Sequence, residues 1–146
     1  MKPFFFIALM LSSFLGLAQD PSAVRWTFAS KPGNNPDEFI LTASAKIQEG
    51  FHVFSPQPGG DGLLIPTEMT LTTKGIKIVS PLAPQRRPVT KQMEGIGMVN
   101  YFEGEIEFNM IIQSKKGVTI SGTMSSQCCN DQMCLPPTDV PFKVKL

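Results

Sequence analysis

Short runs in which apolar and polar residues alternate recur along most of the chain. Residues 105–112 form the clearest run, because Ile106, Phe108 and Met110 fall on one face of an extended strand while charged or polar residues fall on the other. Similar alternation, or a compact run of β-branched and aromatic residues, predicts further strands. These are residues 24–28, 39–47, 51–54, 68–72, 76–79, 118–124 and 140–144.

The connections between these runs are rich in proline and glycine. Residues 55–62 read Ser-Pro-Gln-Pro-Gly-Gly-Asp-Gly, which predicts a loop. Lys115-Lys116-Gly117 predicts a turn that pairs strand 105–112 with strand 118–124 as a hairpin. We find no window with a sustained helical period and capping residues. Strands at this spacing favour an all-β fold, an immunoglobulin-like antiparallel β-sandwich.

The N-terminus predicts a secretory signal peptide over residues 1–18. Lys2 supplies a positive charge, an apolar run from Phe4 continues to Leu17, and Gly16-Leu17-Ala18 offers the small residues that a signal peptidase recognises. An uncleaved anchor is the alternative, but the run is short for a membrane span. We therefore expect a single soluble domain of residues 19–146 in the periplasm.

Charge and cysteine count narrow the classes of partner and chemistry. The formal net charge is +1, and basic residues occur as pairs such as Arg86-Arg87 rather than as a stripe, so we do not expect nucleic acid as a partner. An exported protein can form disulfides. Because the chain has three cysteines, at least one thiol stays outside an intramolecular disulfide.

All three cysteines lie in the segment Cys-Cys-Asn-Asp-Gln-Met-Cys, residues 128–134, which Leu135-Pro136-Pro137 follows. A disulfide here closes a loop of only four or five residues. In the chain-entropy model so small a loop adds little stability. We therefore interpret the disulfide as a group with a chemical role, able to exchange with a partner thiol through a mixed disulfide. An inert structural disulfide is the alternative.

Spacing leaves the pairing open between Cys128–Cys134 and Cys129–Cys134, whereas a bond between the neighbours Cys128 and Cys129 would be strained. Strand parity favours the second pair. Cys128 continues the parity of Ile120 and Met124, which predicts an inward side chain, and Cys129 has the opposite parity, which predicts an outward one.

The cysteine segment resembles the redox loop of the N-terminal periplasmic domain of the thiol:disulfide interchange protein DsbD. That family has two cysteines four or five residues apart, followed by an aromatic or aliphatic residue and Pro-Pro, which is similar to residues 129–137. Residues 50–55 resemble the family's Gly-aromatic strand beside the cysteines. Residues 100–104 resemble its cap loop, whose aromatic residue covers the disulfide.

This resemblance implies an immunoglobulin-like fold with the disulfide at one end. It also implies a role in passing electrons from a membrane-embedded thiol transporter to periplasmic thioredoxin-like proteins, as in cytochrome c biogenesis. The site residues that it implies are the exchanging cysteines Cys134 with Cys128 or Cys129, the cap residue Phe102 or, second, Tyr101, and the flanking residues Phe54 and Phe51, where the family often has tyrosines.

The chain departs from the family in two ways. Full-length members continue into membrane helices and a C-terminal thioredoxin-like domain, whereas this sequence ends at Leu146. We therefore expect a separate membrane protein as the electron donor. The extra cysteine also introduces a competing thiol.

Two other functions stay open. The first is an immunoglobulin-like binding or adaptor domain with a structural disulfide. The second is a periplasmic carrier of Zn or Cu(I), with His52, the only histidine, and the cysteines as ligands. Two adjacent cysteines fit tetrahedral geometry poorly, so we expect no metal and no cofactor. Asp131 is either a proton acceptor for a thiol or a turn residue.

Overall fold

The computed structural model describes residues 23–146, and the predicted signal peptide lies outside them. This part of the chain is all-β, as predicted. Its strands are β1 (Val24–Pro32), β2 (Glu38–Ile47), β3 (His52–Gly59), β4 (Glu68–Leu71), β5 (Lys77–Pro84), β6 (Val89–Met93), β7 (Gly97–Phe102), β8 (Glu105–Gln113), β9 (Thr119–Ser126), β10 (Cys128–Cys129) and β11 (Thr138–Lys145). Within residues 23–146, no helix is long and apolar enough to cross a membrane.

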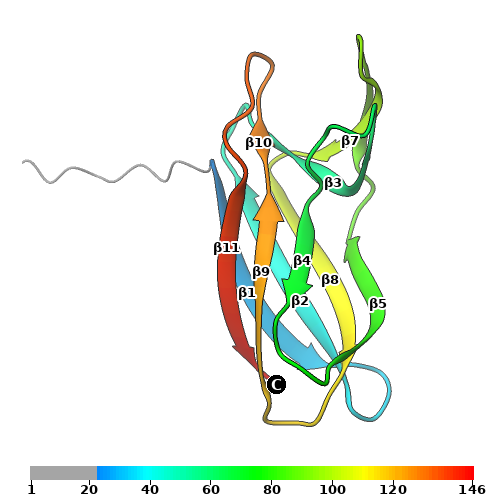
Figure 1. Cartoon of the computed structure of the whole chain (residues 1–146), viewed down its shortest axis with the longest axis vertical. Coiled ribbons are helices and arrows are strands. Elements are labelled where there is room, and N and C mark those ends of the chain that lie inside the picture. The colour runs from blue at the N-terminus through cyan, green and yellow to red at the C-terminus, as the bar shows by residue number, and fades with distance from the viewer. Residues whose placement is uncertain (1–22) are drawn as a thin grey trace, which may run out of the picture.

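The strands form three antiparallel sheets (Figure 1). One has the order β1-β2-β8-β5 and a second the order β11-β9-β4, and these two sheets form the layers of the predicted immunoglobulin-like β-sandwich. The third sheet, which we call the end sheet, has the order β10-β3-β7-β6. Its strands gather at the end of the sandwich that is uppermost in Figure 1, above β9 and β4.

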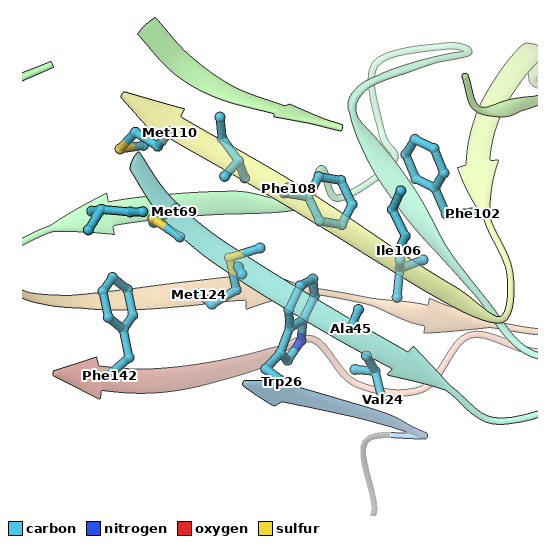
Figure 2. Close-up of a cluster of buried hydrophobic side chains, with 14 of the residues drawn as sticks. Val24, Trp26, Ala45, Met69, Phe102, Ile106, Phe108, Met110, Met124 and Phe142 are labelled. Carbon is cyan, nitrogen blue, oxygen red and sulfur yellow. The ribbon is translucent and has the colours of Figure 1, made fainter. Parts of the chain in front are cut away.

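The main core fills the space between the two large sheets (Figure 2). Ile106, Phe108 and Met110 of β8 are all buried, which confirms the face predicted from their alternation. Trp26 of β1 packs against Phe108 with ring centroids 5.8 Å apart. Its indole Nε1 donates a hydrogen bond of 3.3 Å to the Oγ of Ser126 in β9, so this buried contact links the two layers.

The predicted hairpin at residues 115–117 is wrong in its pairing. Strands β8 and β9 are joined there, but β8 pairs with β2 and β5, and β9 pairs with β4 and β11. Each of the two strands has one apolar face, and in the sandwich these faces pack on opposite sides of the main core. The turn therefore carries the chain from one sheet to the other.

The end sheet contains the largest differences from the predicted strands. Residues 55–59, predicted as a loop, continue β3. Its register with β7 is irregular, because Phe54 pairs with Tyr101 and the next pair is Gly59 with Val99. Pro56 and Pro58, which have no N–H to donate, lie in this bulged stretch. Strands β6 and β7 were not predicted, and residues 100–102, expected in a cap loop, end β7.

Candidate functional site

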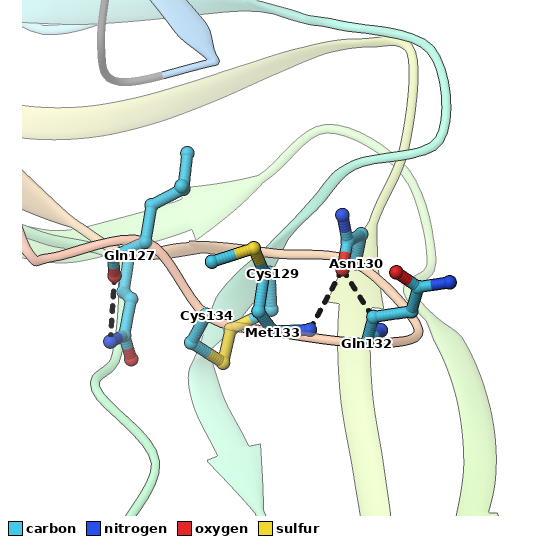
Figure 3. Close-up of a disulfide and its surroundings, with 7 residues drawn as sticks. Gln127, Cys129, Asn130, Gln132, Met133 and Cys134 are labelled. Carbon is cyan, nitrogen blue, oxygen red and sulfur yellow. Dashed lines mark hydrogen bonds between the residues drawn. A yellow bond between two sulfur atoms is a disulfide. The ribbon is translucent and has the colours of Figure 1, made fainter.

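A disulfide joins Cys129 of β10 to Cys134 (Figure 3). This confirms the pair that strand parity favoured over Cys128–Cys134. The two residues also form an isolated antiparallel bridge. Residues 130–133 are therefore the tip of a tight reversal of the chain, which reaches beyond the uppermost end of the sandwich in Figure 1.

Hydrogen bonds fix the shape of this tip. The Oδ1 of Asn130 accepts bonds from the backbone N–H groups of Gln132 and Met133, at 2.9 and 2.8 Å. The backbone N–H of Asn130 donates to the carbonyl of Met133 at 2.9 Å. An asparagine side chain that bonds its own backbone in this way stabilises a turn. At the base of the loop, the N–H of Leu135 donates to the carbonyl of Cys128 at 2.8 Å.

The two cysteines of the disulfide differ in exposure to solvent. Cys134 is exposed, whereas only 2% of Cys129 is exposed. The prediction that Cys129 points away from the main core is correct, but the prediction that it points into solvent is wrong, because other side chains of the end sheet cover it. A thiol that approaches from solvent therefore meets Cys134 first, beside the 58% exposed side chain of Met133.

Cys129 belongs to a small apolar cluster that is separate from the main core. Phe54, Val99, Tyr101 and Cys129 are its buried members. We call this group the end cluster. Its members lie on one face of the end sheet, because directly opposed residues of antiparallel strands share a face, and Phe54 is opposite Tyr101 in the register of β3 and β7. The disulfide is thus anchored on the face turned away from the main core.

The four predicted cap and flanking aromatics divide between the two faces. Phe54 and Tyr101 lie in the end cluster with Cys129, whereas Phe102 lies in the main core and the half-buried Phe51 packs against that core. The structure thus corrects the expectation that Phe102 lies in a surface loop. Phe102 is fully buried, and its ring meets that of Phe108 edge-on with centroids 5.4 Å apart. Neighbouring residues of a strand point to opposite faces, so Tyr101, and not Phe102, is on the face of Cys129.

The third cysteine, Cys128, is also buried, but on the main-core face. It is opposite Val53 in the register of β10 and β3, and both belong to the main core. Strand parity predicted this inward orientation correctly. The peptide between Cys128 and Cys129 therefore separates a thiol in the core from a sulfur at the end of the molecule.

A pocket of about 550 Å³ opens beside the disulfide. It is bounded by both disulfide cysteines, by His52 and Phe54 of β3, and by β6 and the turn that follows it. Lys91, Glu94 and Asp131 place charged groups around it. The pocket thus brings an exposed sulfur, an apolar floor and titratable side chains to one place.

His52 is the site residue whose position sequence reasoning missed. It was considered only as a metal ligand, yet it lies directly opposite Cys129 in the register of β3 and β10 and is 6% exposed. Burial lowers the pKa of His52, and nearby Lys91 also lowers it, whereas the carboxylates of Glu103 and Asp131 act to raise it. Within residues 23–146, no three His, Cys, Asp or Glu side chains are grouped so as to hold a metal ion.

Residues 18–146 match the family model described as the N-terminal part of the thiol:disulfide interchange protein DsbD. No curated protein matches the chain.

Three solved structures resemble the fold. The DsbD N-terminal domain of Neisseria meningitidis in its reduced form has a TM-score of 0.55 and 15% identity, over 88% of this chain and 90% of that one. The N-terminal periplasmic domain of ScsB from Proteus mirabilis has a TM-score of 0.58 and 19% identity, over 84% of this chain and 45% of that one. A complex of the DsbD and PilB N-terminal domains from Neisseria meningitidis has a TM-score of 0.52 and 14% identity, over 88% of this chain and 87% of that one.

Proposed function

Because the chain belongs to the family of DsbD N-terminal domains, we propose that it is a thiol–disulfide exchange module. The Cys129–Cys134 disulfide accepts electrons from a membrane-embedded thiol transporter and passes them to periplasmic thioredoxin-like proteins. The observation that carries this proposal is the asymmetry of the disulfide. Cys134 is exposed at the tip of the molecule, and Cys129 is buried behind it.

This asymmetry assigns a role to each sulfur. A donor thiolate attacks Cys134, the bond from Cys134 to Cys129 breaks, and Cys129 leaves as a thiolate that takes up a proton. A second donor thiolate then attacks the donor sulfur of the mixed disulfide, which releases Cys134 as a thiolate and leaves the donor oxidised. Cys134 next attacks the acceptor's disulfide. Cys129 attacks Cys134 in turn, which reforms the internal disulfide and releases the reduced acceptor.

The surroundings of Cys134 support a protein as the exchange partner. Met133, the residue before Cys134, is 58% exposed, and methionine side chains adapt to different partner surfaces. A related DsbD N-terminal domain has been solved in complex with a PilB N-terminal domain, which supports docking of a second protein domain on a member of this family.

A matched set of alanine variants tests the proposal. The reduced protein is mixed with an oxidised thioredoxin-like protein, and the thiols are trapped by alkylation at successive times. Cys134→Ala should abolish exchange. Cys129→Ala should accumulate a mixed disulfide between Cys134 and the acceptor, because the resolving thiol is absent. Cys128→Ala is the control and should exchange at close to the wild-type rate.

Two outcomes would contradict the proposal. An inactive Cys128→Ala protein with an active Cys129→Ala protein would make Cys128–Cys134 the working pair. Wild-type exchange in all three variants would favour the adaptor function, in which the disulfide is structural.

We also propose that residues 1–18 are removed on export and that residues 19–146 act in the periplasm. The charged and apolar pattern of residues 1–18 supports this, as does the similarity to a periplasmic domain of ScsB. The intact mass of the protein from a periplasmic extract should correspond to a chain that begins at Gln19. A membrane-bound chain that retains residues 1–18 would contradict it.

A further inference from the structure

The end cluster places a titratable ring next to the buried half of the disulfide. His52 and Cys129 are directly opposed in the antiparallel pair of β3 and β10. The Cβ atoms of directly opposed residues are about 4.5–5.5 Å apart, and their side chains share a face. Both residues also line the pocket beside the disulfide. The imidazole is thus a titratable side chain directly across the β3–β10 ladder from Cys129.

Two aromatic rings hold the imidazole in place. Its centroid is 4.6 Å from that of Tyr101 on β7 and 5.5 Å from that of Phe54 on its own strand. These are the residues that bury Cys129 in the end cluster. The rings therefore cover the imidazole and Cys129 together.

The charged groups that face His52 come from three further segments. Glu103 follows β7, Asp131 lies in the disulfide loop, and Lys91 lies on β6. Burial is the largest influence and lowers the pKa of His52, and Lys91 acts in the same direction, against the two carboxylates. The imidazole is consequently neutral near neutral pH, where it can accept a proton.

We propose that His52 accepts the proton of the Cys129 thiol when Cys129 resolves a mixed disulfide on Cys134, and returns a proton when Cys129 leaves. This inference rests on the exchange function proposed above. It adds a proton-transfer group that the paired cysteines do not themselves supply.

The chemistry balances with water as the only further reactant. In the resolving step, the S–H bond of Cys129 breaks and its proton moves to a nitrogen of His52. The thiolate attacks the Cys134 sulfur, the partner leaves as a thiolate, and the Cys129–Cys134 bond reforms. In the opposite direction, His52 first takes up a proton from water, the attacking thiolate displaces Cys129, and the imidazolium gives that proton to the Cys129 thiolate. One group serves as base and then as acid, as microscopic reversibility requires.

A reaction without a protein partner tests this step. Reduced protein that carries Cys128→Ala, so that only two thiols remain, is mixed with 5,5′-dithiobis(2-nitrobenzoate). Attack by Cys134 releases one coloured thiolate, and resolution by Cys129 releases a second. The first-order rate of the second release is then measured against pH, with and without His52→Gln.

We expect His52→Gln to slow resolution by about tenfold or more near neutral pH, because a positioned base commonly contributes at least that factor. The deficit should disappear above the ordinary thiol pKa of about 8.5, where Cys129 ionises without help. Val99→Ala, in the same end cluster but without a ring against the imidazole, is the control. Any loss in that variant should be the same at all pH values, as expected of a packing residue.

A rate deficit in His52→Gln that is constant with pH, or no deficit at all, would overturn the inference. If that variant does not fold, the wild-type protein still provides a test, because His52 is the only histidine of the chain. Its single imidazole resonance should titrate differently in the oxidised and reduced proteins, with a second inflection on reduction that Cys129→Ala removes. Superimposable curves would overturn the inference.

The two proposals can fail separately. If the nitrobenzoate reaction depends on His52 but no thioredoxin-like protein exchanges with the chain, the proposed function is wrong and the proton transfer stands. If exchange proceeds and the nitrobenzoate reaction is indifferent to His52, the proton transfer is wrong and the function stands.

Discussion

The two faces of the end sheet have different roles, although adjacent residues of the same strands form them. One face packs in the main core, and the other surrounds the buried half of the disulfide. Cys128 faces the main core and Cys129 faces the disulfide pocket, and the same division separates Phe102 from Tyr101 one residue away. Across the sheet, Val53 lies opposite Phe102 and Phe54 lies opposite Tyr101. A shift of one residue in register would exchange every one of these positions. The fold and the candidate site thus depend on the same alternation.

The difference between the two faces of the end sheet predicts that the face toward the main core contributes more to stability than the face toward the disulfide pocket. Replacing Phe102 with Ala should have the largest effect, a loss of about 3–5 kcal/mol in the free energy of unfolding, because a large cavity forms in the core. The ring is fully buried against Phe108, and the guanidinium of Arg86 lies 5.2 Å from its centroid. Urea unfolding of the oxidised protein measures this loss.

The rate at which dithiothreitol reduces the folded Phe102→Ala protein should stay close to the wild-type rate, since Phe102 is not in the cluster around Cys129. A small stability loss together with a clearly faster reduction would place Phe102 over the disulfide after all, and the division between the two faces would be wrong.

Replacing Tyr101 with Ala should show the reverse balance. The loss of stability should be about 2 kcal/mol, below the range usual for a buried aromatic residue, because the neighbouring pocket is open and water can enter the space. Reduction by dithiothreitol should become faster, because Tyr101 is one of the residues that bury Cys129. Stopped-flow reduction and urea unfolding of Tyr101→Ala and Phe102→Ala, measured side by side, compare the two faces directly. Equal reduction rates would remove the proposed shielding role of Tyr101.

Strict alternation made the large sheets predictable. Ile106, Phe108 and Met110 repeat at every second position, and one side of β8 is buried to match. The pairing of β8 could not be predicted in the same way. A glycine turn at residue 117 indicates that the chain reverses there, but it does not indicate whether the next strand joins the same sheet or the facing one.

The end sheet was less predictable because both of its faces are covered. Val53-Phe54, Tyr101-Phe102 and Cys128-Cys129 are adjacent apolar pairs, and in each pair one residue enters the main core and the other the end cluster. Such pairs indicate a strand buried on both sides. That signal was available in the sequence. The pairs alone do not indicate that Tyr101, rather than Phe102, lies beside Cys129, because that depends on how β7 pairs with β3.

Replacing Cys128 with Ala sharpens the comparison at the cysteines themselves. We expect a loss of about 1 kcal/mol in the free energy of unfolding, since a single buried sulfur is removed from the main core. Guanidinium unfolding of the oxidised variant measures this value. Ser121→Ala, at a half-buried position of β9 outside both clusters, is a suitable control. A loss of several kcal/mol would show that Cys128 has a larger structural role than its packing indicates.

The smallest expected effect is a dependence of stability on pH that comes from His52, on the face of the end sheet that borders the disulfide pocket. Because burial lowers the pKa of His52 in the folded protein, the unfolded chain binds the proton at a higher pH than the folded chain does. The stability associated with neutral His52 is therefore fully present above the unfolded pKa of about 6.5, and it is lost as the pH falls toward the lower folded value.

His52→Gln should remove this contribution, so the difference between the wild-type and variant free energies of unfolding should change as the pH falls below about 6.5. Subtracting the two curves cancels the carboxylates that both proteins share. Lys46→Gln is the matched control. Its ion pair with Glu105 spans 3.7 Å between side chains that are each 75% exposed, and solvent screens such a pair. Parallel curves for the wild type and His52→Gln would mean that the imidazole is as accessible to protons in the fold as in the unfolded chain, and the pocket face would then lack the buried base that the exchange chemistry uses.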